Sequence, residues 1–227
     1  MSAVETALET ELNQQLEALI RQTQLKVSVE KRSQLVRFVL MMHKWNKAYN
    51  LSSVREPQQM LIKHIMDSLV VLPHLHKGIH SKQIGFEQVR KIADVGTGPG
   101  LPGIPLAIMC EDIEFTLIDS LGKRIRFIKQ VCFELGIKNV QALHTRVENV
   151  QQQDFDLVLS RAFASLEDML SWCAHLVAHG GEFLALKGHL HQDELAKVPA
   201  AFSVAQTYPL LVPSLEGERH LVRIIRA

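Results

Sequence analysis

Apolar residues in the first third of the chain recur every three or four positions, which is the spacing of one face of a helix. The stripe of a first helix is formed by Leu8, Leu12, Leu16 and Leu19, and that of a second by Leu35, Phe38, Val39, Met42 and Trp45. A third helix is expected from Pro57 to Leu72, because proline suits a first helical turn and Pro73 would end the helix. The amino-terminal part of the chain is therefore predicted to be helical.

Polar residues form a second face on the third predicted helix, where His64, Asp67 and Ser68 lie together. Spacing leaves two interpretations open, an exposed side of the helix or the edge of a functional site. Trp45 and Tyr49 are also four residues apart. They either cap the helical core, which we favour, or stack on a nucleic-acid base.

From Lys91 onward, short apolar runs alternate with helical periodicity. The predicted strands are residues 92–95, 115–119, 139–144, 155–160 and 182–188, and two later runs, 204–212 and 220–225, would complete the sheet. This alternation is typical of an α/β fold with a mainly parallel sheet and helices on both faces. Its ligand is expected at the carboxyl ends of the strands.

Two helices of this second part are predicted in more detail. Inward positions of the first are Leu121, Ile125, Ile128, Cys132 and Leu135, with Gly136 as C-cap. The second is marked by Leu166, Met169, Leu170, Cys173 and Val177 and is broken by Gly180-Gly181.

Residues 74–90 show no clear periodicity, so we place there the junction between a helical extension, 1–85, and the sheet-containing unit, 86–227.

Glycines at alternate positions follow the first predicted strand, in the run Asp94-Val-Gly-Thr-Gly-Pro-Gly100. Gly96, Gly98 and Gly100 allow backbone conformations and close approaches that a Cβ would block. The pattern D-x-G-x-G-x-G is the first motif of S-adenosylmethionine-dependent methyltransferases. An acid at this strand end suits an ammonium-bearing ligand better than a pyrophosphate, which prefers amides and a helix dipole.

The same loop leaves two other interpretations open. Gly98-x-Gly100-x-x-Gly103 also fits the dinucleotide pattern G-x-G-x-x-G, and an ordinary turn between strand and helix would need no ligand.

Asp119 lies at the end of the second predicted strand, at the separation along the chain from the glycine loop at which nucleoside-binding folds keep an acid for the ribose. Arg146-Val-Glu148 follows the third strand, where a polar group can reach an adenine.

Net charge is only +1, so a nucleic-acid interaction would have to depend on local basic clusters. Such clusters without an acid are Lys44, Lys47 and Arg55, and Lys123, Arg124, Arg126 and Lys129. Solvated helix faces are the alternative interpretation. We expect no metal site, because the histidine pairs lack partners at zinc spacing, and no membrane segment, so a cytoplasmic protein is expected.

The segment after the fourth strand, Ser160-Arg-Ala-Phe-Ala-Ser165, excludes two chemistries. Enzymes that methylate exocyclic amino groups usually carry Asn/Asp-Pro-Pro-aromatic here, and carbon-5 pyrimidine enzymes need a cysteine nucleophile. Neither is present in this segment.

From about residue 40 the chain resembles the bacterial small-subunit ribosomal RNA guanine-N7 methyltransferases, also called glucose-inhibited division protein B. The shared motifs are residues 43–52, 64–68, 94–105, 119–124, 160–165 and 186–188. The resemblance implies a Rossmann-like class I fold and methyl transfer from S-adenosylmethionine to N7 of one guanine in 16S ribosomal RNA or the small subunit. It further implies that Gly96 and Leu101 line the methionine and ribose, Asp119 the ribose, Val147 and Glu148 the adenine, and Arg161 the space between cofactor and RNA.

Guanine N7 carries a lone pair and no proton, so this reaction needs alignment rather than a general base. Our hypothesis is that Arg161 and Lys187 hold RNA phosphate or guanine O6, while Lys44, Lys47, Lys123, Arg124 and Arg126 contact the RNA backbone. His64 and Asp67 either shape the guanine pocket or brace the helical extension. We expect a monomer. The rival functions are a nicotinamide-dinucleotide oxidoreductase and a non-catalytic RNA-binding regulator.

Overall fold

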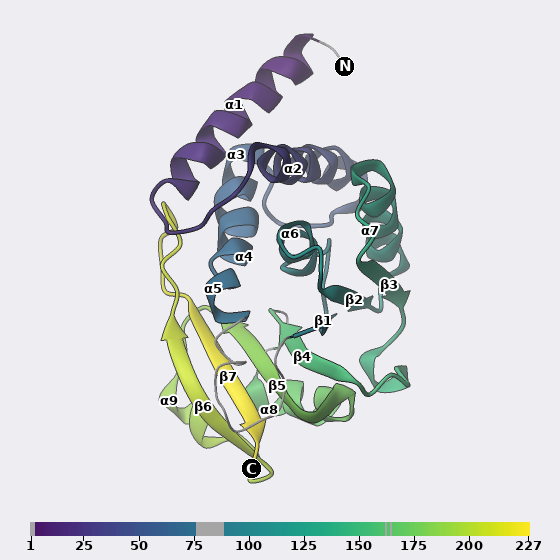
Figure 1. The fold of residues 1–227 in the computed structure, drawn as a ribbon, viewed down its shortest axis with the longest axis vertical. Helices are drawn as coiled ribbons and strands as arrows, with labels where there is room; N and C mark the ends of the chain where they lie inside the picture. The colour runs from purple at the N-terminus through teal and green to yellow at the C-terminus, as the bar shows by residue number, and fades with distance from the viewer. Residues whose placement is uncertain (1–2, 76–88, 162, 164) are drawn as a thin grey trace.

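A seven-stranded sheet forms the centre of the computed structural model, which describes residues 3–75, 89–161, 163 and 165–227 (Figure 1). The strands lie in the order β3-β2-β1-β4-β5-β7-β6, and only the pairings that involve β7 are antiparallel. Their bounds are β1 Lys91–Val95, β2 Glu114–Asp119, β3 Val140–His144, β4 Phe155–Ser160, β5 Val177–Lys187, β6 Phe202–Pro209 and β7 His220–Arg226. The mainly parallel α/β sheet predicted from the sequence is confirmed.

Successive residues of the strands alternate between two hydrophobic cores, one on each face of the sheet. Ile92 and Leu157 belong to the larger core, whereas their neighbours Ala93 and Val158 belong to the smaller one. The larger core also takes residues from α1 Ala3–Ile20, α2 Val29–Tyr49, α6 Gly103–Met109 and α7 Gly122–Leu135. The smaller core is covered by α8 Leu166–Cys173, with short turns at Val147–Asn149 and Ala174–Leu176, and α9 Gln192–Ala196 lies beside α8.

The amino-terminal helices pack on the sheet-containing part through α6 and α7. Phe38 of α2 stacks on Phe127 of α7 with ring centroids 6.1 Å apart, and Trp45 lies 5.4 Å from the same ring. Trp45 also contacts Tyr49 and packs against the larger core, which supports the core interpretation for Trp45, whereas Tyr49 is 42% exposed. The predicted boundary between residues 85 and 86 lies outside the described residues.

The third predicted helix differs from the expectation. It consists of α3 Pro57–Met60, a π-helical turn Leu61–Met66 and α4 Asp67–Leu69. Pro73 does not end it, because a separate short helix, α5 Leu72–Leu75, begins one residue earlier and holds the proline in its first turn, where a missing N–H costs nothing. None of the helices in the described ranges is long and apolar enough to cross a membrane.

Two details of the sequence interpretation were wrong. Val177 and Gly180-Gly181 lie inside β5 rather than at the end of a helix, because a bulge between β4 and β5 accommodates them; a Cβ on Gly181 would lie 2.8 Å from the Phe155 carbonyl oxygen. Leu121 is 43% exposed instead of buried, since it precedes the first turn of α7 and its side chain does not share the inward face.

The contact between α2 and α7 gives a stability prediction. Phe38→Ala removes a fully buried ring and should lower the free energy of unfolding by about 3–5 kcal/mol. Phe133→Ala, on the exposed face of α7, should change it by less than about 0.5 kcal/mol. Urea denaturation followed by circular dichroism measures both, and equal midpoints for the two variants would contradict this account of the packing.

Candidate active site

A loop at the carboxyl end of β1 brings its glycines over a fully buried carboxylate, Asp94. The Oδ2 atom of Asp94 accepts hydrogen bonds from the Thr97 hydroxyl at 2.6 Å and the Gly103 amide at 2.9 Å. The Oδ1 atom is buried and has no hydrogen-bond partner among the described residues. Burial raises the pKa of Asp94 to about 6, because the charged form loses its hydration.

Glycine is required where this loop turns into α6. Gly100 has φ +93°, and a Cβ there would lie 2.5 Å from the Ile104 side chain. At Gly103 a Cβ would lie 2.7 Å from Asp94 Oδ2 and 2.9 Å from the Leu117 side chain. The helix therefore begins in direct contact with the carboxylate only because two side chains are absent.

A second buried carboxylate, Asp119 at the end of β2, lies next to the same loop. It accepts hydrogen bonds from the amides of Gly98 at 3.0 Å and Leu121 at 2.8 Å. Its Oδ2 also pairs with Arg124 at 3.0 Å. Arg124 was expected to contact RNA from the surface of its helix, but the structure places its guanidinium against Asp119.

A cavity of about 520 Å³ opens above these strand ends. Four of the residues expected at the cofactor line it, namely Gly96, Asp119, Val147 and Glu148. Asp94, Gly98, Gly100 and Leu101 form the buried support of the loop. We call this space the acidic cavity, because its lining holds three carboxylates, Asp119, Glu148 and Asp168, against two guanidinium groups, Arg124 and Arg146.

Two aromatic residues of the acidic cavity were missed by the sequence analysis. Phe163 and Trp172 meet edge to face, with ring centroids 5.6 Å apart. Phe163 lies in the segment already singled out after β4, whereas Trp172, on α8, carried no signal beyond its position in a helix. Its 48% exposure at the cavity is a property of the fold.

A second cavity, of about 510 Å³, lies beside the ends of β4 and β5. We call it the cationic cavity, because its lining includes Lys63, Arg161, Lys187 and Arg219. Arg161 was expected at the cofactor, and the structure places it in the lining of this cavity instead of the acidic one. Phe163, two residues later, lines the acidic cavity, so one short segment contributes to both.

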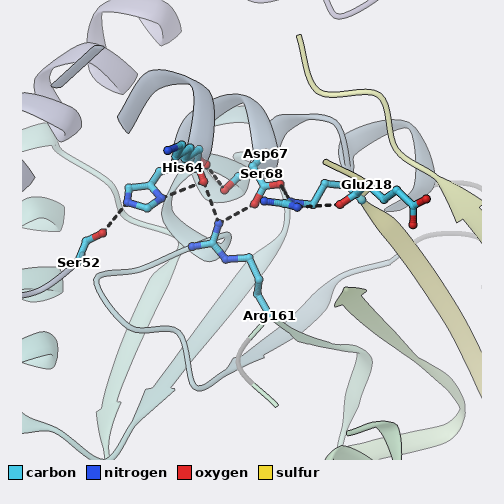
Figure 2. A network of polar contacts seen from close by, with 8 residues as sticks. Ser52, His64, Asp67, Ser68, Arg161 and Glu218 are labelled. Atoms are coloured by element: carbon cyan, nitrogen blue, oxygen red, sulfur yellow. Dashed lines mark hydrogen bonds and ion pairs between the residues drawn. The ribbon is translucent and has the colours of Figure 1, made fainter. Parts of the chain in front are cut away.

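Asp67 links two cationic side chains that line the cationic cavity (Figure 2). One of its oxygens pairs with Arg161 at 2.8 Å and the other with Arg219 at 2.9 Å. Arg219, which the sequence analysis missed, directly precedes β7. The three residues are far apart in the sequence, and no spacing rule links them.

His64 is neutral in this network. Burial, with the nearby Arg161 charge, lowers the pKa of His64 to about 4. Its Nδ1 lies 2.9 Å from the Lys63 carbonyl oxygen and its Nε2 2.8 Å from the Ser52 hydroxyl. Because a carbonyl only accepts, Nδ1 donates and Nε2 accepts from Ser52. His64 and Asp67 thus line the cavity and also make contacts to other elements, so the two interpretations, a guanine pocket and a brace for the helical extension, both stay open.

The remaining predicted residues lie elsewhere. Lys187 lines the cationic cavity and pairs with Glu194 at 2.7 Å. Lys44 and Lys47 are exposed on α2, and Arg126 is exposed and Lys123 half-buried on α7. These four do not belong to the described lining of either cavity. Among the described residues, no group of three or more His, Cys, Asp or Glu side chains is arranged to hold a metal ion.

Two solved methyltransferase structures share this fold. Magnesium protoporphyrin IX methyltransferase from Synechocystis PCC 6803, with bound SAH, aligns with a TM-score of 0.56 at 13% identity, over 84% of this chain and 100% of that one. The ribosomal protein L11 methylase from Lactobacillus delbrueckii subsp. bulgaricus aligns with a TM-score of 0.51 at 16% identity, over 75% and 79%. At these identities the likeness shows the fold, the Rossmann-like class I methyltransferase fold.

Relatives by sequence are much closer. The ribosomal RNA small subunit methyltransferase G of Shewanella sp. (strain MR-4) is 56% identical over 216 residues, which is 95% of this chain and 99% of that protein. The protein of the same name from Photobacterium profundum is 57% identical over 212 residues, 93% and 97% of the two chains. A family model described as rRNA small subunit methyltransferase G matches residues 31–222. The chain therefore belongs to the rRNA small subunit methyltransferase G family.

Proposed function

We propose that this protein transfers a methyl group from S-adenosylmethionine to N7 of one guanine in 16S ribosomal RNA. The observation that carries the proposal is the pair of cavities that share the Arg161–Phe163 segment, one acidic and one cationic. A cationic ligand with a ribose suits the first, and a base with its phosphates suits the second. Because its substrate is ribosomal, we place the protein in the cytoplasm.

The acidic cavity fits S-adenosylmethionine by its own chemistry. Asp119 lines the cavity, and because its oxygens already accept hydrogen bonds from the Gly98 and Leu121 amides and pair with Arg124, a ribose hydroxyl would have to share them.

The surface offered to the adenine combines apolar and polar side chains, namely Val147, Glu148, Phe163 and Trp172. The unpartnered Oδ1 of Asp94 lies beneath the loop and favours a ligand that carries positive charge. When bound, S-adenosylmethionine supplies an electrophilic methyl group.

The protein's own task is to hold the guanine in line. N7 already presents a lone pair, so no side chain has to remove a proton. Correct alignment of reacting groups can lower a barrier by roughly 7 to 11 kcal/mol. Arg161, fixed by Asp67, is placed to hold guanine O6 or a phosphate, and Lys187 supports it from the next strand.

Contacts with the RNA backbone are assigned to Lys44, Lys47, Lys123 and Arg126, which lie on the packed helices α2 and α7. Arg124 is reassigned to the cofactor side, because it pairs with the ribose acid, Asp119. The helical extension, 1–85, would then contribute both RNA contacts and one wall of the cationic cavity.

The direct test is tritium transfer from labelled S-adenosylmethionine to small-subunit RNA, as naked RNA and as assembled particles. We expect label in a nuclease digest to co-migrate with N7-methylguanosine, and excess NADH to leave the rate unchanged. Transfer to another atom would overturn the N7 assignment. RNA binding without any transfer would favour the regulator interpretation.

Removal of the Arg161 guanidinium should separate catalysis from folding. Arg161→Ala should lower methyl transfer by roughly 100- to 1000-fold, because one preorganised cationic donor is lost. Asp67 keeps its partner Arg219, so the melting temperature should fall only slightly. Arg37→Ala, which removes an exposed guanidinium from α2, is the matched control and should retain activity. Equal rates for the two variants would remove Arg161 from the mechanism.

Cofactor affinity should depend on pH through Asp94. Because the pKa of Asp94 is raised in the folded protein, the contribution of Asp94 to stability without ligand is present at low pH and is lost as the pH rises through about 6. A cationic ligand binds to the ionised form of Asp94. Affinity should therefore be about fourfold weaker at pH 5.5 than at pH 7.5. The Asp94→Asn variant should bind the cofactor weakly at both pH values.

Trp172 fluorescence in a Trp45→Phe background reports this binding, since the chain has two tryptophans and only Trp172 lines the acidic cavity. A wild-type affinity that is equal at the two pH values would contradict the role given to Asp94.

A further inference from the structure

The charges of the side chains that line the cationic cavity indicate which of them could recognise a guanine. We propose that the Glu216 carboxylate accepts hydrogen bonds from N1–H and the 2-amino group of the target guanine. This inference rests on the proposed function and names the residue that makes the site specific for guanine. An extruded base is usually read by hydrogen bonds on its Watson–Crick edge.

Most polar side chains of the cavity cannot serve that edge. N1–H and the 2-amino group are donors, so their partner must be an acceptor. Lys63, Arg161, Lys187 and Arg219 only donate, which suits guanine O6 and phosphate oxygens. The acceptors with full negative charge in the lining are Asp67 and Glu216.

Asp67 is already used. Each of its oxygens pairs with one guanidinium, Arg161 at 2.8 Å and Arg219 at 2.9 Å, and its side chain is 6% exposed. The Gly188 carbonyl oxygen lies 3.0 Å from His220 Nδ1. Glu216, in contrast, is exposed and has no hydrogen bond or ion pair with any described residue. It is the carboxylate in this lining that remains available for a ligand.

The position of Glu216 matches the shape of the base. N7 must face the acidic cavity, and the Watson–Crick edge lies on the far side of the purine. Residues 210–219 join β6 to β7, on the side of β5 remote from β1 (Figure 1). A carboxylate carried by this loop therefore approaches the edge that points away from the cofactor.

The same arrangement excludes adenine. Adenine has a lone pair at N1 where guanine has a proton, so a carboxylate would face a lone pair there. A site built to bind a donor rejects an analogue that lacks it, because its own polar group is left unpaired. Specificity for guanine then needs no contact with N7 itself.

The test compares Glu216→Gln with a matched control two residues away. Glu218 pairs with His189 at 2.8 Å and lies outside the cavity lining, so Glu218→Gln removes the same charge from the loop, and weakens the contact with His189, without changing a residue that lines the cavity. The substrates are small-subunit RNAs with guanosine or inosine at the nucleotide that the wild-type protein methylates. Inosine keeps N7, O6 and N1–H and lacks the 2-amino group.

We expect Glu216→Gln to lower kcat/KM on guanosine by about 10- to 100-fold, with Glu218→Gln unchanged. The wild-type protein should lose a similar factor with inosine, whereas Glu216→Gln should discriminate between the two substrates only a few-fold. Cofactor binding, followed by Trp172 fluorescence, should be the same in all variants.

Two results would overturn the assignment of Glu216. One is full activity of Glu216→Gln, and the other is discrimination against inosine that is as strong in this variant as in the wild type. Failure of the wild-type protein to methylate guanosine-containing RNA is a separate outcome: it would overturn the proposed function, and the Glu216 assignment with it.

Discussion

The paired carboxylate of Asp67 is the interaction on which the rest of the site depends. A buried charge is tolerated only when it is compensated, and here two guanidinium groups compensate one carboxylate from opposite sides. Asp67 belongs to a helix of the amino-terminal part, Arg161 directly follows β4, and Arg219 directly precedes β7. One ionic cluster thus fixes the relative positions of three segments that the sequence keeps far apart, and it leaves the two cationic side chains on the wall of one cavity (Figure 2).

The acidic and cationic cavities place groups of opposite charge along one edge of the sheet. Asp94 and Asp119 end neighbouring strands and are both buried, which keeps the negative charge close to the glycine loop. Arg161 and Lys187 follow the next two strands and give the other half of the edge its positive charge. The order of the strands therefore determines which charge lies on which side.

Local patterns predicted the sheet, most helices and the glycine loop, because alternation, helical spacing and glycine placement reflect constraints that act over a few residues. They also predicted that Asp94 and Asp119 lie at the carboxyl ends of their strands, because a position along a strand is a local property. They did not predict the pairing of Arg124 with Asp119 or the exposure of Trp172. Nor did they predict that Arg219 and Glu216 line the cationic cavity. Each of these features depends on tertiary packing. The bulge at Gly181 was misread for a related reason: a glycine pair signals a break equally well in a helix and in a strand.

The reversed direction of β7 has a consequence for the order in which the protein becomes competent. Because β7 runs against its neighbour β5, its first residues lie beside the carboxyl ends of the parallel strands, and Arg219 reaches Asp67 from there. In chain order this strand comes after all the others. During translation Asp67 and Arg161 are synthesised before Arg219, so the second guanidinium is the last member of the ionic cluster to be added. A nascent chain on the ribosome thus lacks the complete ionic cluster until Arg219 has emerged.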